Sequence, residues 1–204
     1  MINTILFDLG GVLIGWNPII PYLKAYEGDR ERAQWFLDNV CTMGWNEEQD
    51  GGRSIAEANA IKIKEYPEYE ELIKLYYGEW ETMLTGAIEG TVEILKALKT
   101  SEQYRIYAIT NWSAETFPVA QARYDFLKLF EGISVSGELK MRKPFPEIYQ
   151  YTLEKYAINP SEAVFIDDNL KNIKAAEALG IHAIHFQNPK QLGRELEGLG
   201  IRIS

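Results

Sequence analysis

Short apolar runs that stop abruptly at polar residues recur along the chain. The three clearest cover residues 4–8, 106–110 and 163–167, and each ends in aspartate or threonine. Such a run, apolar at nearly every position, is typical of a strand buried on both faces of a parallel sheet. Weaker runs at 133–136 and 181–186 repeat the pattern. These five runs predict strands of one parallel sheet.

Helical patterns separate these runs. Residues 145–156 have Pro146 near the first turn, where proline is favoured. Residues 170–179 follow Asn169, a residue type that caps helices well, and stop at Gly180. Strand and helix therefore alternate, which predicts an α/β protein with a Rossmann-like, open parallel sheet.

The segment 15–88 breaks this alternation, because it contains helical patterns and no convincing strand. Apolar residues recur there at the spacing of one helix face, at Ala33, Phe36, Leu37 and Val40 and again at Leu72, Tyr76, Trp80 and Met83. Ser54 is a predicted helix start. We interpret residues 15–88 as an inserted helical cap subdomain and residues 1–14 plus 89–204 as the α/β core domain.

Composition narrows the class of protein. With 204 residues, 46% of them hydrophobic, the chain can bury a full core. The formal net charge of −9 disfavours binding to DNA, RNA or an anionic membrane. The apolar stretch 5–13 is interrupted by Asp8 and has no basic leader, so it resembles neither a signal peptide nor a membrane span. Cys41 is the only cysteine, which suits a reducing cytosol. We expect a cytoplasmic protein with a small-molecule partner, either a monomer or a homodimer.

Ligands of open α/β sheets bind beyond the carboxyl ends of the strands, so the residues at which the apolar runs stop are informative. These are Asp8, Thr110 with Asn111, and Asp167 with Asp168. Lys143 adds a positive charge from a loop, and the following Pro144 favours an extended backbone there.

These residue types fit a phosphoryl-transfer site, where catalysis is mostly positioning and charge stabilisation. Asp8 would attack phosphorus and carry the phosphoryl group as a covalent intermediate. Thr110 and Asn111 would donate hydrogen bonds to the phosphoryl oxygens, and Lys143 would offset their charge.

The carboxylates also predict a metal. Asp8, Asp168 and, as a helper, Asp167 would repel one another without a cation, and oxygen ligands favour Mg²⁺ over Zn²⁺. Taken singly, each residue also has an ordinary structural interpretation: the aspartates as turn or helix caps, Lys143 as a solvated surface lysine. Only their combination predicts chemistry.

Four motifs carry a resemblance to a known family. They occupy residues 7–13, 109–113, 142–144 and 165–169, in this order. The chain resembles the haloacid dehalogenase-like (HAD-like) hydrolases, and among them the phosphatases whose helical cap follows the first strand, including sugar-phosphate phosphatases. The resemblance implies that Asp8 is the nucleophile and a metal ligand, and that Lys143 and Asp168 complete the site. It also implies that the backbone carbonyl of Gly10 reaches the metal.

Gly10 is also a departure from the family pattern, because most such phosphatases have there a second aspartate that acts as general acid and base. Losing a positioned acid commonly costs on the order of 100-fold to 10,000-fold in rate. Glu47, Glu48 and Asp50 lie in what the sequence suggests is a Gly-terminated loop of the cap, and one of them could supply the proton instead.

Two other functions stay open on the sequence alone. A 2-haloacid dehalogenase resembles this chain in fold and uses the same aspartate without a metal, although Asp167 and Asp168 favour the metal-dependent phosphatase. Gly10 also allows a non-catalytic phosphate-binding protein. Among other residues, His182 and His185 are expected to pack away from the site, whereas Trp16, Trp45 and Trp112 are candidates either for the core or for a sugar-sized pocket.

Overall fold

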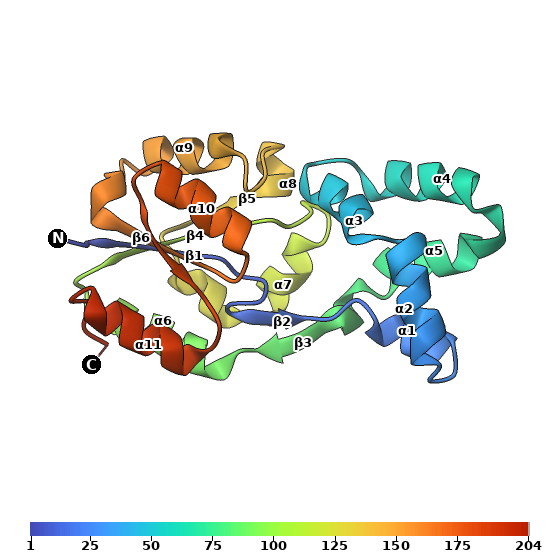
Figure 1. The fold of residues 1–204 in the computed structure, drawn as a ribbon, viewed down its shortest axis with the longest axis horizontal. Helices are drawn as coiled ribbons and strands as arrows, with labels where there is room; N and C mark the ends of the chain where they lie inside the picture. Colours follow the sequence, from blue (N-terminus) through green and yellow to red (C-terminus); the bar gives the residue numbers. More distant parts are fainter. Residues whose placement is uncertain (204) are drawn as a thin grey trace.

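A parallel sheet of five strands lies between helices in the left-hand part of the molecule (Figure 1). The structure, a computed structural model, describes residues 1–203. The strands are β1 (Thr4–Phe7), β4 (Arg105–Thr110), β5 (Gly132–Val135), β6 (Ala163–Asp167) and β7 (His182–His185). Their order is β5-β4-β1-β6-β7, and each neighbouring pair is parallel. All five predicted strands are present, and the predicted α/β class is confirmed.

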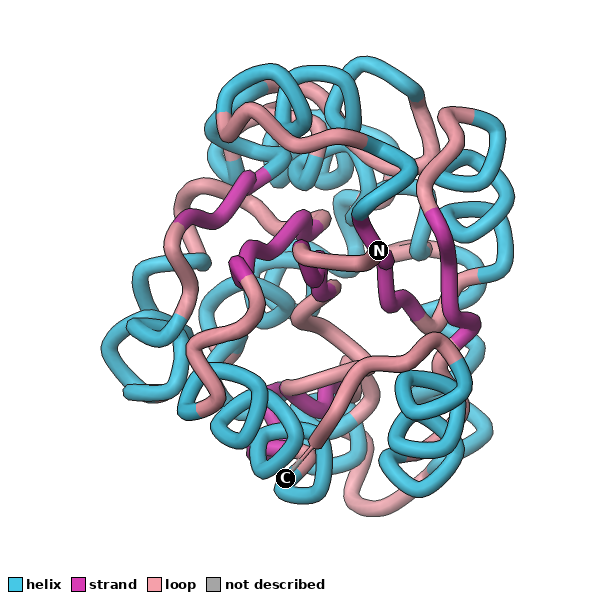
Figure 2. Tube along the Cα trace, turned by 90° about the vertical axis from the view of Figure 1, so that its left-hand side faces the viewer, coloured by secondary structure: helices cyan, strands magenta, loops and turns pink. Residues whose placement is uncertain are grey.

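Helices cover both faces of the sheet, as Figure 2 shows from the end of the molecule. They are α6 (Glu89–Thr100), α7 (Phe117–Arg123), α9 (Pro146–Lys155), α10 (Leu170–Ala178) and α11 (Pro189–Gly198), with a short α8 (Ser136–Leu139) and 3-10 turns at Asp125–Leu129 and Pro160–Glu162. Successive residues of β1 point to opposite faces. Ile5 and Phe7 pack in the cluster that includes α6 and α11, whereas Leu6 packs in the cluster that includes α9 and α10. Burial on both faces explains why the strands are continuously apolar.

The ends of the core helices follow the sequence signals. Pro146 is the first residue of α9. Asn169 caps α10, since its side chain accepts a hydrogen bond from the backbone N–H of Lys171 at 3.0 Å. This N-terminal helix cap starts α10 directly after the Asp167–Asp168 pair, and so fixes the direction in which the chain leaves β6.

Between two short strands, β2 (Ile14–Trp16) and β3 (Leu84–Ala87), the chain is helical. This part contains α1 (Ile20–Ala25), α2 (Arg30–Asn39), α3 (Met43–Asp50), α4 (Ile55–Glu65), α5 (Glu70–Gly78) and 3-10 turns at Pro67–Tyr69 and Trp80–Met83. The prediction of no strand within 15–88 was wrong, because β2 and β3 pair as an antiparallel ribbon. Strands of three and four residues are too short to show a period. We propose that this ribbon is the connection between core and cap.

The helical part has an aromatic core of its own. The Tyr22 ring centroid lies 4.9 Å from that of Phe36 and 6.4 Å from that of Tyr76. The predicted apolar face within residues 33–40 is buried throughout. In the predicted face within residues 72–83, only Leu72 is half-buried. Ser54 caps α4 as predicted, by accepting from the N–H of Glu57. These helices lie on the side toward which the strands of the sheet run (Figure 1).

The last turn of helix α3 contacts the loop that carries Arg142. The segment with Glu47, Glu48 and Asp50 is the last part of this helix, so the prediction of a loop there was wrong. Thr42 caps the helix by accepting from the N–H of Trp45 at 3.2 Å, a cap that the sequence analysis did not identify. Glu47 and Glu48 form ion pairs with Arg142 of the core loop at 3.5 and 3.2 Å. Asp50 is thereby held above the strand ends.

Within residues 1–203, no helix is long and apolar enough to cross a membrane.

Candidate active site

Lys143 is the centre of the site. Its side chain is fully buried, and its ammonium nitrogen lies 2.6 Å from Asp167 Oδ2 and 2.9 Å from Asp8 Oδ2. Burial alone would lower the pKa of Lys143, but Asp167 and Asp8 raise it above its usual value. The lysine therefore stays protonated and joins the ends of two neighbouring strands.

Asp8 follows the last residue of β1 and is 8% exposed. Its backbone N–H donates to the carbonyl of Ile166 in β6 at 2.8 Å, and its Oδ1 accepts from the N–H of Leu9 at 2.7 Å. The carboxylate is thus fixed by its own loop on one oxygen and by Lys143 on the other. A carboxylate held in this way needs little reorganisation before it reacts.

Asp167 is held more completely than the sequence suggested. Its Oδ1 accepts from the N–H of Asn169 at 2.7 Å, and Asn172 Nδ2 lies 3.0 Å from both of its oxygens. Together with Lys143 these donors surround a fully buried carboxylate. We therefore infer that Asp167 orients Lys143 rather than binding a metal directly. Asn172 was missed in the sequence, because nothing in the sequence shows that the first turn of α10 points back to the strand end.

Asp168 lies on the open side of the cluster, and Gly11 allows it to approach. Gly11 has a φ of +75°, and a Cβ at that position would lie 2.1 Å from Asp168 Oδ2. His185 Nε2 forms a hydrogen bond of 2.9 Å with the backbone carbonyl of Asp168. The prediction that His185 packs away from the site was wrong, since it lines the same cavity as Asp168. His182 is exposed rather than packed.

Thr110 and Asn111 end β4 beside this cluster. Both polar groups of the Asn111 side chain bind the backbone of Lys143: Nδ2 donates to its carbonyl at 2.9 Å, and Oδ1 accepts from its N–H at 2.8 Å. Asn111 therefore positions the lysine loop. The Thr110 hydroxyl is buried and has no hydrogen-bond partner among the described residues, and Thr110 itself does not line the cavity. An unsatisfied buried hydroxyl is costly, which is consistent with an acceptor that enters with a ligand.

The carboxylates have room for a cation. Oxygens of Asp8, Asp167 and Asp168 lie within 4.8 Å of one another. Burial raises the pKa of Asp8 well above its usual value, Lys143 opposes this, and Asp167 and Asp168 add to it. Burial and then Asp167 likewise raise the pKa of Asp168. A divalent cation would stabilise both ionised forms, and all-oxygen ligands suit a hard ion. The three aspartates therefore fit a bound divalent cation.

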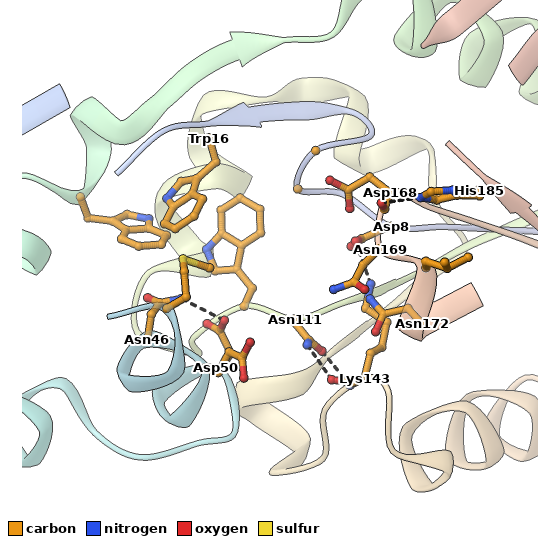
Figure 3. Close-up of a pocket in the computed structure, with 17 residues that line it drawn as sticks. Asp8, Trp16, Asn46, Asp50, Asn111, Lys143, Asp168, Asn169, Asn172 and His185 are labelled. Carbon is orange, nitrogen blue, oxygen red and sulfur yellow. Dashed lines mark hydrogen bonds and ion pairs between the residues drawn. The ribbon is translucent and has the colours of Figure 1, made fainter. Parts of the chain in front are cut away.

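A cavity of about 640 Å³ opens above the cluster (Figure 3). Its floor includes Asp8, Gly10, Lys143 and Asp168, and its other walls include Trp16, Met43, Trp80 and Trp112 together with Asn46, Glu47 and Asp50. Trp16 and Trp112 thus line the cavity, whereas Trp45 packs among the helices between β2 and β3 and donates to the carbonyl of Ala58. Trp80 was not singled out for the pocket, because its helical spacing predicted only packing. The site therefore combines a polar floor with a partly aromatic wall.

Comparison with known proteins establishes the family. Residues 2–180 match the model of the haloacid dehalogenase-like hydrolases, so the chain belongs to this family of hydrolases. A solved HAD family enzyme from Bacteroides thetaiotaomicron, in complex with magnesium and inorganic phosphate, superposes with a TM-score of 0.68 at 27% identity, over 92% of this chain and 96% of that one.

Among curated relatives, a sesquiterpene phosphatase of Aspergillus oryzae is 27% identical over 95% of this chain and 94% of its own length. A D-ribitol-5-phosphate phosphatase of Bacteroides thetaiotaomicron is 23% identical over 96% of this chain and 97% of its own length. A drimenol cyclase of Aspergillus calidoustus is 26% identical over 98% of this chain, which spans only 37% of that protein. The chain thus corresponds in length to the phosphatases and to one part of the cyclase.

The contact between Gly11 and Asp168 generates a prediction. Gly11→Ala should weaken Mg²⁺ binding at least about tenfold, because its Cβ would displace the Asp168 carboxylate. Isothermal titration calorimetry measures the dissociation constant. Gly28→Ala is the matched control, because Gly28 also has a positive φ, of +90°, and no described atom lies within 4 Å of an added Cβ. Both variants should lose roughly 1 kcal/mol of stability. Equal Mg²⁺ affinity in the two variants would contradict the role of Gly11.

Proposed function

We propose that the protein is a Mg²⁺-dependent phosphatase that hydrolyses a small phosphorylated metabolite through an aspartyl-phosphate on Asp8. The observation that carries the proposal is the ammonium of Lys143 between Asp8 and Asp167, at the floor of a cavity onto which Asp168 also opens. Bound Mg²⁺ would be held by Asp8, Asp168 and the backbone carbonyl of Gly10, and would offset negative charge on the phosphoryl group. Localisation in the cytoplasm and a monomeric or dimeric state belong to the same proposal.

Each residue has a defined part in this reaction. A carboxylate oxygen of Asp8 attacks phosphorus, and the bond to the leaving oxygen breaks. Lys143 stabilises the phosphoryl oxygens, while Asp167 keeps the ammonium in place and Asn111 fixes the lysine loop. The Thr110 hydroxyl donates to a phosphoryl oxygen and so acquires an acceptor. Water then cleaves the aspartyl-phosphate and regenerates the Asp8 carboxylate.

The walls of the cavity favour a polyhydroxylated leaving group, such as that of a sugar or polyol phosphate. Trp16, Trp80 and Trp112 offer indole rings on which the C–H face of a sugar can pack. Asn46 and Asp50 offer polar atoms that hydroxyl groups can satisfy. A hydrocarbon chain such as a terpenyl group would bury those polar atoms without partners, which is unfavourable. The named activities of the relatives include both kinds of substrate.

Replacement of the nucleophile tests the reaction. Asp8→Asn should lower Mg²⁺-dependent phosphate release at least about 1,000-fold, because an amide does not form the covalent intermediate. The measurement is a screen of phosphorylated metabolites with and without Mg²⁺. Asp38→Asn, an exposed aspartate on α2, is the control and should retain wild-type rates. Wild-type activity that resists a chelator, or a halide-releasing activity, would instead favour the dehalogenase. The absence of any turnover would favour the non-catalytic binding protein.

A tryptophan substitution tests the substrate class. Trp16→Ala should raise the KM for a sugar or polyol phosphate about two- to tenfold with a smaller change in kcat, because it removes a packing surface for the leaving group. Steady-state kinetics measure this. Trp35→Ala is the control, since Trp35 is 49% exposed and does not line the cavity. A wild-type kcat/KM for farnesyl phosphate above that for every sugar or polyol phosphate would contradict the proposal.

A further inference from the structure

The floor of the cavity has no acidic side chain at position 10, where most phosphatases of this type carry their general acid and base. Gly10 lines the cavity, and apart from its two chain neighbours no described residue has an atom within 4 Å of the place that a Cβ of Gly10 would take. No side chain from elsewhere in the described part of the chain therefore replaces the missing acid at that point. A donor, if the site has one, has to come from another wall of the cavity.

The titratable residues that line the cavity are Asp8, Glu47, Asp50, Lys143, Asp168 and His185. Asp8, Lys143 and Asp168 already have parts in the proposed reaction. His185 is bound to the backbone of Asp168, on the metal side of the site. Glu47 has a side chain that is 54% exposed and is ion-paired with Arg142, so its carboxylate is already engaged outside the floor of the cavity. Asp50 remains.

Asp50 is built into the cavity wall as an oriented, buried carboxyl group. It is the last residue of α3 and is 8% exposed. Asn46 Nδ2 donates to Asp50 Oδ2 at 3.2 Å, and the Tyr77 hydroxyl donates to Asn46 Oδ1 at 3.0 Å, which fixes the direction of the amide. Figure 3 shows Asp50 projecting from the cap helix on the side of the cavity opposite Asp8 and Asp168. A leaving group that extends from the floor across the cavity would therefore approach Asp50.

The surroundings of Asp50 favour its protonated form. Burial, followed by the negative charge of Glu47, raises its pKa to about 7, although the backbone of Ser113 and the charges of Arg142 and Lys143 act in the opposite direction. Tyr76 and Tyr77 of α5 are the other titratable groups whose charge is coupled to that of Asp50, and burial raises the pKa of both hydroxyls, so they stay neutral. A carboxyl group that titrates near neutral pH can both give and accept a proton there.

We propose that Asp50, supplied by the cap, is the general acid and base of the reaction in place of a residue at position 10; this inference rests on the proposed phosphatase function. As an Asp8 oxygen bonds to phosphorus, the bond from phosphorus to the leaving oxygen breaks, and that oxygen takes the proton of Asp50 and leaves as an alcohol. The Asp50 carboxylate then takes a proton from water as the water oxygen attacks phosphorus. The bond between phosphorus and Asp8 breaks, which releases inorganic phosphate and restores both aspartates.

Leaving groups that differ in their need for a proton test this role. The probes are benzyl phosphate, whose alkoxide leaves poorly without protonation, and 4-nitrophenyl phosphate, whose phenolate leaves without help. Asp50→Asn should lower kcat/KM for benzyl phosphate about 100-fold to 10,000-fold and kcat/KM for 4-nitrophenyl phosphate less than about tenfold, because kcat/KM covers only the steps up to the aspartyl-phosphate. Wild-type kcat/KM for benzyl phosphate should also fall as the pH rises through about 7, where Asp50 loses its proton, and this limb should be absent in the variant.

Two controls separate chemistry from structure. Asp38→Asn removes an exposed carboxyl group of α2 that does not line the cavity, so both rates should be unchanged. The raised pKa of Asp50 means that its contribution to stability is lost as the pH rises from the usual aspartate range through about 7. Asp50→Asn removes this buried charge, so at alkaline pH the variant should melt no lower than the wild type.

The outcomes are distinct. An equal loss of kcat/KM for both substrates, or no loss for either, would overturn the role of Asp50 while leaving the phosphatase intact. If the wild type shows no Mg²⁺-dependent turnover of either substrate, the proposed function fails, and this inference fails with it.

Discussion

One buried ammonium group among three carboxylates is the constraint on which the site depends. Lys143 has no exposed side-chain area, and a buried ammonium without partners would be strongly destabilising. Asp167 and Asp8 supply the compensating charge, and Asn172 donates a hydrogen bond to the Asp167 carboxylate. Since three carboxylates outnumber one ammonium, negative charge remains at the floor of the cavity, and a divalent cation would offset it. In the proposed function, the pair that stabilises the folded site is therefore also the pair that prepares it for metal and phosphate.

The sheet supplies the positions for this cluster. Asp8, Thr110 and Asp167 stand at the ends of three adjacent parallel strands, so their distances are set by strand spacing rather than by flexible loops. The helical part supplies the opposite wall, and α3 is joined to the lysine loop by the ion pairs of Arg142. The proposed division of labour follows from this geometry: the strand ends would fix the phosphoryl group, and the helical part would meet the leaving group.

Much of this was predictable from the sequence, for identifiable reasons. Continuous apolar runs predicted all five core strands, and the polar residues at their ends predicted which side chains come together. The structure places Asp8, Lys143, Asp167 and Asp168 in one cluster, although their catalytic and metal-binding parts remain proposals.

What the sequence did not show depends on tertiary contacts. The ribbon of β2 and β3 is too short for periodicity, and the Gly-rich end of α3 resembled a loop although Thr42 caps that helix. Asn172 and His185 join the site only because α10 and β7 fold back along β6. Asn111 was predicted to bind phosphate, yet its side chain binds the backbone of Lys143. Such contacts join residues that no local pattern relates.

The central claim is that metal and phosphate are bound together at this cluster. Calorimetric titration of the wild-type protein with inorganic phosphate, in the presence and in the absence of Mg²⁺, tests it most directly. We predict that Mg²⁺ tightens phosphate binding at least about tenfold and that phosphate tightens Mg²⁺ binding by the same factor, as thermodynamic linkage requires. Phosphate affinity that does not depend on Mg²⁺ would contradict the account.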